Sequence, residues 1–128
     1  MKFRIEDDVL SIIFEGGEQF WAIKRRIVLP KVNIANVTWQ EGAQIPRKEL
    51  GWRIGGTAVP RFLLAGRFAG GQGKNFVYLQ KPLGYFGHIQ VKHVLTFELV
   101  HSSYKHMFFT VDKPDIAESI IGWWSSNI

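Results

Sequence analysis

The segment from Val111 to Trp124 holds the one pattern in the chain that clearly predicts an α-helix. Its apolar residues recur at helical spacing and share one stripe, namely Ile116, Ala117, Ile120, Ile121 and Trp124. Asp112 is placed to cap the helix, and Pro114 suits the first turn, where its missing N–H is no loss. A terminal helix with so broad an apolar stripe needs a surface to cover. We therefore expect it to close one open end of a curled β-sheet.

Trp123 lies off this stripe. Two interpretations are open for it: the ring packs against the body of the domain, or it sits at a contact between subunits.

Length and composition indicate one globular domain. The chain has 128 residues, of which 46% are hydrophobic, 14% aromatic and 21% charged. It has no cysteine, which excludes disulfides, thiolate nucleophiles and cysteine zinc sites. Five of the first eight residues are charged, and no apolar run approaches the ~20 residues that cross a bilayer. We expect a cytoplasmic protein.

Most of the chain before the helix predicts short strands separated by turn signals. The first extended run, Phe3 to Phe14, turns or kinks at Asp7-Asp8, and a phase slip at Ala35-Asn36 predicts a β-bulge. The polar segment Gln40–Leu50, with its glycine and proline, predicts a loop. Later strand signals are the alternation of Phe62, Leu64, Gly66 and Phe68, a short run at Ile89–Val91, a longer one at Leu95–Leu99 and a last one at Met107–Val111.

This pattern predicts a fold that is mainly β with one C-terminal helix. About seven antiparallel strands with regular turn signals are typical of a barrel or a sandwich. The terminal helix favours a partly open barrel, because the apolar stripe can cover side chains that the strands leave exposed.

The chain resembles bacterial pleckstrin-homology-like domains over most of its length. The resemblance rests on turn glycines, core aromatics and an Asp-x-Pro helix start, in the segments Gly55–Pro60, Gly66–Phe68, Phe76–Leu79, Leu95–Leu99 and Phe108–Ile121. It implies one domain over residues 1–128, a split barrel of seven strands in two sheets, capped by the helix. It also implies binding of lipids, peptides or proteins, and in some bacterial members assembly into homo-oligomers.

One departure from that family bears on lipid binding. Lipid-binding members cradle inositol phosphates with basic residues at the end of the first strand and just after it. Here the corresponding loop, Glu15–Glu18, is acidic, and no lysine stands near Phe14. Lys24 and Arg26 keep the spacing of two of the basic residues, so they remain candidate anion contacts.

The middle of the chain is strongly basic. Residues 42–111 contain nine lysines and arginines against two acidic residues, a local net charge of +7 within a chain of net charge +5. Such a charge invites an anionic partner, such as phospholipid headgroups, nucleic acid or an acidic protein face. The alternative is that scattered basic residues keep sheet edges soluble. We keep anionic lipid as a possible partner and expect no nucleic acid.

The segment Lys81–His88 carries Tyr85 and Phe86 between glycines, with Lys81 and Lys92 on its flanks. Aromatic residues at a loop tip suit insertion into a membrane interface or a protein pocket. The competing interpretation is that both rings fold back over the edge of the barrel.

No catalytic constellation is recognisable, and we predict neither an enzyme, nor a metal site, nor a cofactor. The serines lack the strained turn that exposes a nucleophile. His101 and His106 flank a short hairpin loop, but a tight metal site needs at least one more protein ligand, so solvated histidines are the simpler interpretation.

The hypothesis that follows is a non-enzymatic interaction module that self-associates or docks a protein partner. The alternative is a peripheral binder of anionic membrane lipids through the basic surface and the loop with Tyr85 and Phe86. The sites expected to make these contacts are Lys81, Tyr85, Phe86 and Lys92.

Overall fold

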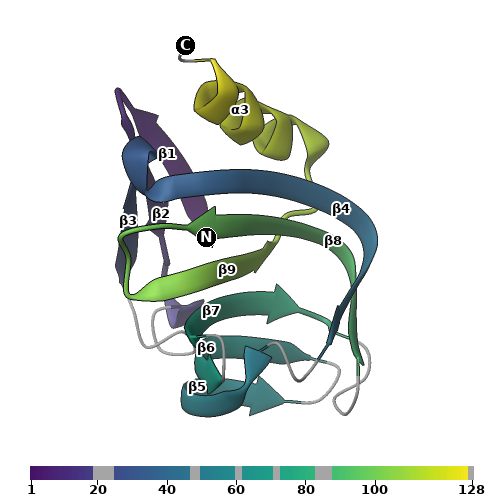
Figure 1. The fold of residues 1–128 in the computed structure, drawn as a ribbon. Helices are drawn as coiled ribbons and strands as arrows, with labels where there is room; N and C mark the ends of the chain where they lie inside the picture. Colours follow the sequence, from purple (N-terminus) through teal and green to yellow (C-terminus); the bar gives the residue numbers. More distant parts are fainter. Residues whose placement is uncertain (19–24, 47–49, 60–61, 71–72, 83–87, 127–128) are drawn as a thin grey trace.

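The computed structural model describes residues 1–18, 25–46, 50–59, 62–70, 73–82 and 88–126 (Figure 1). These ranges contain nine strands, one short 3-10 helix and one C-terminal α-helix. In chain order the elements are β1 (Lys2–Glu6), β2 (Val9–Ile13), β3 (Arg26–Pro30), η1 (Lys31–Asn33), β4 (Ile34–Pro46), β5 (Trp52–Val59), β6 (Leu63–Gly70), β7 (Gly73–Gln80), β8 (His88–Leu99), β9 (Tyr104–Thr110) and α3 (Pro114–Ser125).

The strands form two sheets. A three-stranded sheet has the order β1-β2-β3, and a six-stranded sheet has the order β4-β8-β9-β7-β6-β5. The predicted class, mainly β with one C-terminal helix, is confirmed. The split barrel of about seven antiparallel strands is wrong in three respects, since the described residues form nine strands, the six-stranded sheet is not closed into a barrel, and β7 pairs with β9 in parallel.

Part of the difference in strand number arises at Asp7. This residue has a φ of 52°, a left-handed conformation that Asp tolerates better than most residues. The chain therefore reverses, and Glu6 of β1 pairs with Val9 of β2. The run that the sequence predicts as one strand is a hairpin of two.

The segment expected to be a loop from Gln40 onward is mostly strand. β4 continues to Pro46 because β8 supplies a pairing partner along its whole length, from Leu99 opposite Ile34 to His88 opposite Pro46. β8 is likewise one strand of 12 residues, where the sequence predicts two. The predicted bulge near Ala35 is confirmed, since the register shifts between Ile34 and Asn36.

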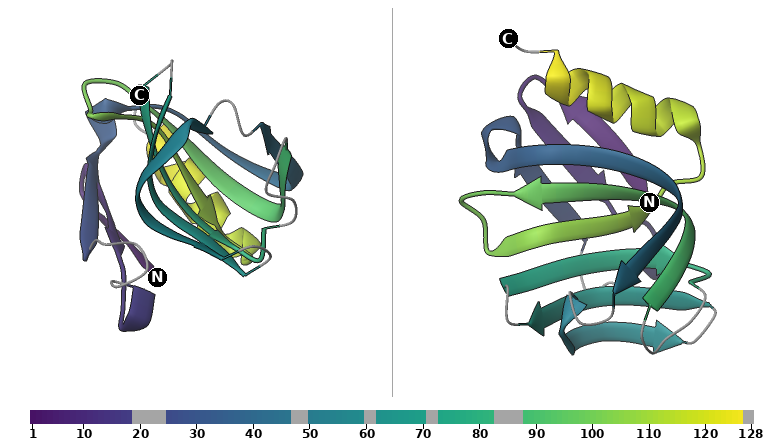
Figure 2. Two further views of the ribbon diagram at one scale, coloured as in Figure 1. Left: turned by 90° about the horizontal axis from the view of Figure 1, so that it is seen from below. Right: turned by 45° about the vertical axis from the view of Figure 1, so that its right-hand side comes forward.

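β4 and β8 bend sharply together (Figures 1 and 2). Gly42 has a φ of 62° at the middle of β4. Trp39 and Ile45 lie an even number of positions apart, so a regular strand would direct them to one face. Trp39 instead packs against one hydrophobic cluster and Ile45 belongs to the other. The bend thus transfers the buried face of the strand from one side of the sheet to the other.

The six-stranded sheet consequently has a core on each face. On β7, Phe76 and Tyr78 belong to the cluster shared with the three-stranded sheet and α3. Val77 and Leu79 belong to a second cluster, which also takes residues from the bent half of β8. Burial on both faces explains why Phe76–Leu79 is an unbroken apolar run rather than an alternating one.

Helix α3 lies along the β4 edge of the six-stranded sheet (Figure 1). Ala117 and Ile120 are buried, and Trp124 donates a hydrogen bond from Nε1 to the carbonyl oxygen of Ile34 at 3.0 Å. Trp123 donates from Nε1 to the carbonyl oxygen of Asp7 at 2.8 Å, so this ring contacts the β1–β2 turn. The predicted apolar stripe therefore covers sheet residues, as expected.

The predicted helix cap is wrong. The N-cap residue is Lys113 and not Asp112, and it makes no side-chain hydrogen bond to the helix. Pro114 occupies the first turn as predicted. Within the described ranges, no helix has the length and apolar character needed to span a membrane.

Candidate functional site

Strand β9 lies between β7 and β8 and ends before the first residues of β8 are reached. It ends at Thr110, opposite Val94 of β8. β8 extends beyond this point over residues 88–93, which in the described part of the chain pair with β4 alone. On the other side, β7 ends at Gln80, one position past Thr110 in its register with β9, and Lys81 follows it. We call the region between these two segments the sheet opening.

The chain leaves the sheet after Thr110 because the next residues are held elsewhere. Val111 is buried in the cluster under the three-stranded sheet. Its carbonyl oxygen accepts a hydrogen bond from Nε1 of Trp39 at 3.0 Å. Pro114 then begins α3 and lacks the N–H that a strand would need. These contacts direct the backbone toward α3. The residues that follow Thr110 therefore do not continue β9 between β7 and β8.

The side chain of Thr110 forms the base of the sheet opening. Its hydroxyl oxygen accepts a hydrogen bond from the backbone N–H of Gln80 at 3.1 Å and lies 3.4 Å from the carbonyl oxygen of Tyr78, to which it donates. Two side-chain bonds thus connect β9 to β7 where the backbone ladder between them stops.

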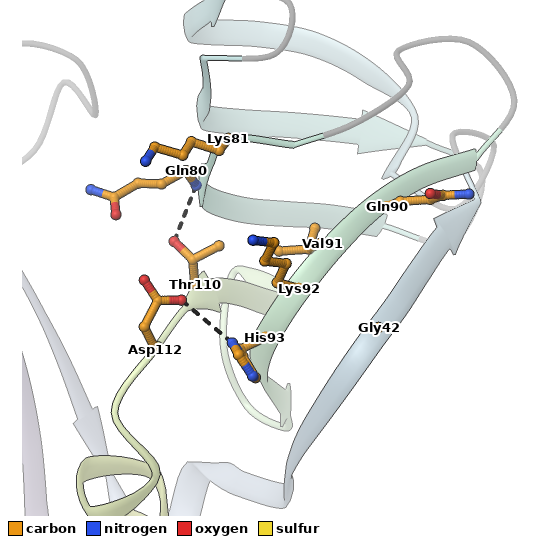
Figure 3. A pocket seen from close by; sticks show the side chains of 9 residues that line it. All are labelled: Gly42, Gln80, Lys81, Gln90, Val91, Lys92, His93, Thr110 and Asp112. Atoms are coloured by element: carbon orange, nitrogen blue, oxygen red, sulfur yellow. Dashed lines mark hydrogen bonds and ion pairs between the residues drawn. The ribbon is translucent and has the colours of Figure 1, made fainter.

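A pocket of about 700 Å³ occupies the sheet opening (Figure 3). Seven of its nine lining residues are polar, and the lining comes from four strands and the segments that follow two of them. The lining residues are Gly42, Gln80, Lys81, Gln90, Val91, Lys92, His93, Thr110 and Asp112. Most of the polar side chains carry hydrogen-bond donors, which suits a ligand that presents oxygen acceptors.

The two lysines stand on opposite sides of the opening. Lys81 follows the end of β7, and Lys92 lies on β8 beside the bend (Figure 3). Both are exposed, and neither has an ion-pair partner among the described residues. Their ammonium groups are therefore available to an incoming anionic group.

The acidic groups near the pocket face His93. Asp112 Oδ1 lies 3.6 Å from His93 Nδ1, and Glu41 Oε1 lies 3.9 Å from His93 Nε2. The imidazole also stacks on Trp39, with ring centroids 5.3 Å apart and an interplanar angle of 9°. Both carboxylates therefore lie near the histidine, and among the described ion pairs neither is joined to Lys81 or Lys92.

The structure brings together two of the residues expected from the sequence and separates the others. Lys81 and Lys92 line one pocket. Arg26 is exposed at the start of β3 in the other sheet and does not line it. Lys24, Tyr85 and Phe86 lie outside the described residues, so their predicted roles stay predictions.

Sequence reasoning missed Phe62. The alternating pattern places this ring on a buried face, but 60% of its surface is exposed. Its carbonyl oxygen accepts a hydrogen bond from the backbone N–H of Lys81 at 2.8 Å, so an aromatic side chain and a cation share one end of the molecule. The remaining pocket residues were missed too, because no sequence signal shows that β9 lies between β7 and β8.

The two histidines that flank the hairpin loop lie in different surroundings. His106 pairs with Glu98 across β8 and β9 and stacks on Phe108, while His101 is exposed in the preceding turn. The described residues contain no group of three or more His, Asp or Glu side chains placed to bind a metal ion.

Comparison of the chain with protein family models, with curated proteins and with solved structures found no match. A proposal about function therefore depends on the geometry of the sheet opening.

Proposed function

We propose that this protein is a non-enzymatic interaction module that binds an extended segment of a protein partner as an added β-strand in the sheet opening. The observation that carries the proposal is the early end of β9 at Thr110 between two longer strands. Alternate residues among 88–93 of β8 then present backbone N–H and C=O groups on the side away from β4, where no described strand pairs with them. Peptides commonly bind to such edges by strand addition.

The opening begins where β9 no longer separates β7 from β8. Neighbouring strands lie about 4.8 Å apart, so β7 and β8, which flank β9, are separated by about twice that distance at Thr110. An extended segment that continued the line of β9 would pair with β8, because the amide of Gln80 at the end of β7 already bonds Thr110 and the amide of Lys81 bonds Phe62. Antiparallel pairing with β8 would continue the direction already present in the sheet.

The free edge of β5 is a poorer docking site. Its register with β6 shifts between Arg53 and Gly55, and a bulge in an edge strand opposes further pairing. Gly55 and Gly56 also lack side chains that would order the edge. Residues 88–93 of β8, by contrast, pair with β4 without a register shift.

The expected affinity is moderate. About six backbone hydrogen bonds at ~1 kcal/mol each give a dissociation constant on the order of tens of micromolar. A short probe without matched side chains will bind more weakly, because its ordering opposes association.

The test uses the full chain and a synthetic octapeptide that alternates threonine and glutamine. Titration is followed by amide resonances of the isotopically labelled protein. We expect shifts in residues 88–93 and at Gln80 and Lys81, and a loss of binding when alternate peptide nitrogens are methylated. Equal binding of the methylated peptide, or shifts confined to β5, would contradict strand addition. Concentration-dependent shifts at 88–93 without peptide would identify a second copy of the chain as the occupant.

A second candidate function is peripheral binding to anionic membranes, and exposed Phe62 beside Lys81 is the observation that favours it. An aromatic ring and a neighbouring ammonium group, in a protein of net positive charge, suit the headgroup region of an anionic membrane. Cosedimentation with phosphatidylserine vesicles should then decrease steeply with salt and with Phe62→Ser. Equal sedimentation with neutral vesicles, or none, would remove this candidate.

Three further expectations from the sequence stay proposals. The two sheets and the C-terminal helix support kinship with bacterial pleckstrin-homology-like domains, while the parallel β7–β9 pair is a departure from the antiparallel pattern expected of them. The lack of cysteine supports a cytoplasmic location. The lack of a nucleophile turn in the sequence supports a role without catalysis.

A further inference from the structure

We infer that the occupant of the sheet opening is an acidic segment, with a carboxylate held between Lys81 and Lys92. This inference rests on the proposed function and specifies the chemistry of the partner. It is drawn from the registers of β9 with its two neighbours, from the charges that line the pocket and from the ion pairs already present there.

The registers relate the positions of the two lysines to Thr110. β7 pairs in parallel with β9 so that Tyr78 lies opposite Phe109, and β8 pairs antiparallel so that Val94 lies opposite Thr110. Counted along the two registers, Lys81 and Lys92 each stand two positions beyond Thr110, although Lys81 follows the end of β7 and turns there with a φ of 52°. Both lysines line the same pocket, so the second residue of a strand that continues β9 would lie near both of them.

The chain's own residue at that level does not occupy the position. Asp112 is the second residue after Thr110, but the backbone has left the sheet at buried Val111. The Asp112 carboxylate instead lies 3.6 Å from His93, and no described ion pair joins it to either lysine. The opening thus has two cations at a level where an acidic side chain of a partner can be placed between them.

The charges around the opening favour an acidic partner over a neutral or basic one. The pocket lining has two lysines against one carboxylate, and that carboxylate faces His93. The lining therefore carries more positive than negative charge, which favours an acidic peptide over a basic one.

The site also has a direction. In a strand that continues β9, the first residue lies beside Gln80 and His93, near the carboxylates of Asp112 and Glu41. An acidic residue there would meet like charges. We therefore expect the acidic residues of the partner to begin at the level of the lysines and not at the base of the opening.

The experiment compares three octapeptides in which threonine alternates with glutamate, glutamine or lysine, together with the glutamate peptide methylated at alternate backbone nitrogens. Each is titrated into the full chain at about 50 mM salt, with affinity measured by fluorescence anisotropy and the site by amide resonances. We expect the glutamate peptide to bind about tenfold more tightly than the glutamine peptide, and the lysine peptide to bind most weakly.

Charge-removal variants locate the effect. Lys81→Gln and Lys92→Gln should each weaken the glutamate peptide about two- to fivefold and leave the glutamine peptide unchanged. Lys74→Gln is the matched control, because Lys74 is exposed on β7 at the far end of the same strand. It should leave both peptides unchanged. Amide spectra of each variant establish that it is folded.

The outcomes separate this inference from the proposed function. If the three peptides bind equally while methylation still abolishes binding, the acidic specificity is overturned and strand addition stands. If the methylated glutamate peptide binds as well as its parent, strand addition itself fails. If Lys74→Gln weakens the glutamate peptide as much as Lys92→Gln does, the attraction is a general effect of net charge and the assignment to the two lysines is wrong.

Discussion

The side-chain oxygen of Thr110 lies 3.1 Å from the backbone nitrogen of Gln80, and this hydrogen bond joins β9 to β7 at the base of the sheet opening. The same hydroxyl donates to the carbonyl oxygen of Tyr78 at 3.4 Å. A side chain here performs the role that the backbone performs along the rest of the ladder. The position of the opening therefore depends on one residue as well as on the path of the chain.

Replacing Thr110 by valine keeps the shape of the side chain and removes both bonds. We expect Thr110→Val to lower the free energy of unfolding by about 1 kcal/mol, because the Gln80 amide loses its acceptor. Urea denaturation measures the stability, and hydrogen exchange of the Gln80 amide measures the local effect. Thr38→Val, at an exposed position on β4, is the control and should change neither quantity. Unchanged exchange at Gln80 in Thr110→Val would contradict this account.

Two glycines should respond very differently to alanine. Gly56 has a φ of 116°, and a Cβ there would collide with the carbonyl of Ala65 in β6. Gly56→Ala should therefore cost more than about 4 kcal/mol and give little folded protein. Gly42 has a φ of 62° but open space around its Cβ position, so Gly42→Ala should cost only about 1–2 kcal/mol through backbone strain. Circular dichroism and urea denaturation of both variants test the difference, and equal stabilities would contradict it.

The two adjacent tryptophans should contribute unequally to stability. Trp124 bonds the carbonyl of Ile34 in a partly buried setting, whereas the bond from Trp123 to Asp7 is exposed. Trp124→Phe leaves a shielded acceptor unpaired and should cost about 1–3 kcal/mol, while Trp123→Phe should cost less than about 1 kcal/mol because water can replace the indole. Urea denaturation measures both values. A larger loss for Trp123→Phe would show that its contact with the β1–β2 turn is the more important.

Stability should fall at alkaline pH. Burial raises the pKa of Tyr78 above its usual value near 10, the negative charge of Glu18 raises it further, and a hydrogen bond with Gln80 opposes both. The folded state therefore holds the phenol proton more tightly than the unfolded state does. The stabilisation is fully present below the unfolded pKa and is lost as the pH rises from that value through the folded pKa.

Urea denaturation at about pH 8 and at pH values above 10 tests this dependence, with Tyr78→Phe as the comparison. The variant should lose less stability than the parent over the same interval. Part of the fall should remain, because burial also raises the pKa of Tyr104, against the opposing effect of Arg67. Identical curves for parent and variant would exclude Tyr78 as the cause.

The candidate site was only partly predictable. Lys81 and Lys92 stand out in the sequence because they flank an aromatic loop, and the structure brings both to one pocket. Thr110 and Gln90 carry no comparable signal, since their position depends on which strands are neighbours. Phe62 was misassigned because the alternation of Phe62, Leu64 and Phe68 matches a buried face, while the first of these residues lies just before β6 and is exposed.

The sequence alone determined the local features of this protein: the terminal helix, the bulge near Ala35 and the predominance of strands. Each of these follows from residues close together in the chain, through side-chain periodicity and backbone preference. The tertiary structure alone decided that β9 lies between β7 and β8, that β4 and β8 bend at Gly42, and that Lys81 and Lys92 line one pocket. Strand order joins residues far apart in the chain, and its free energy comes from packing and pairing that no short segment contains.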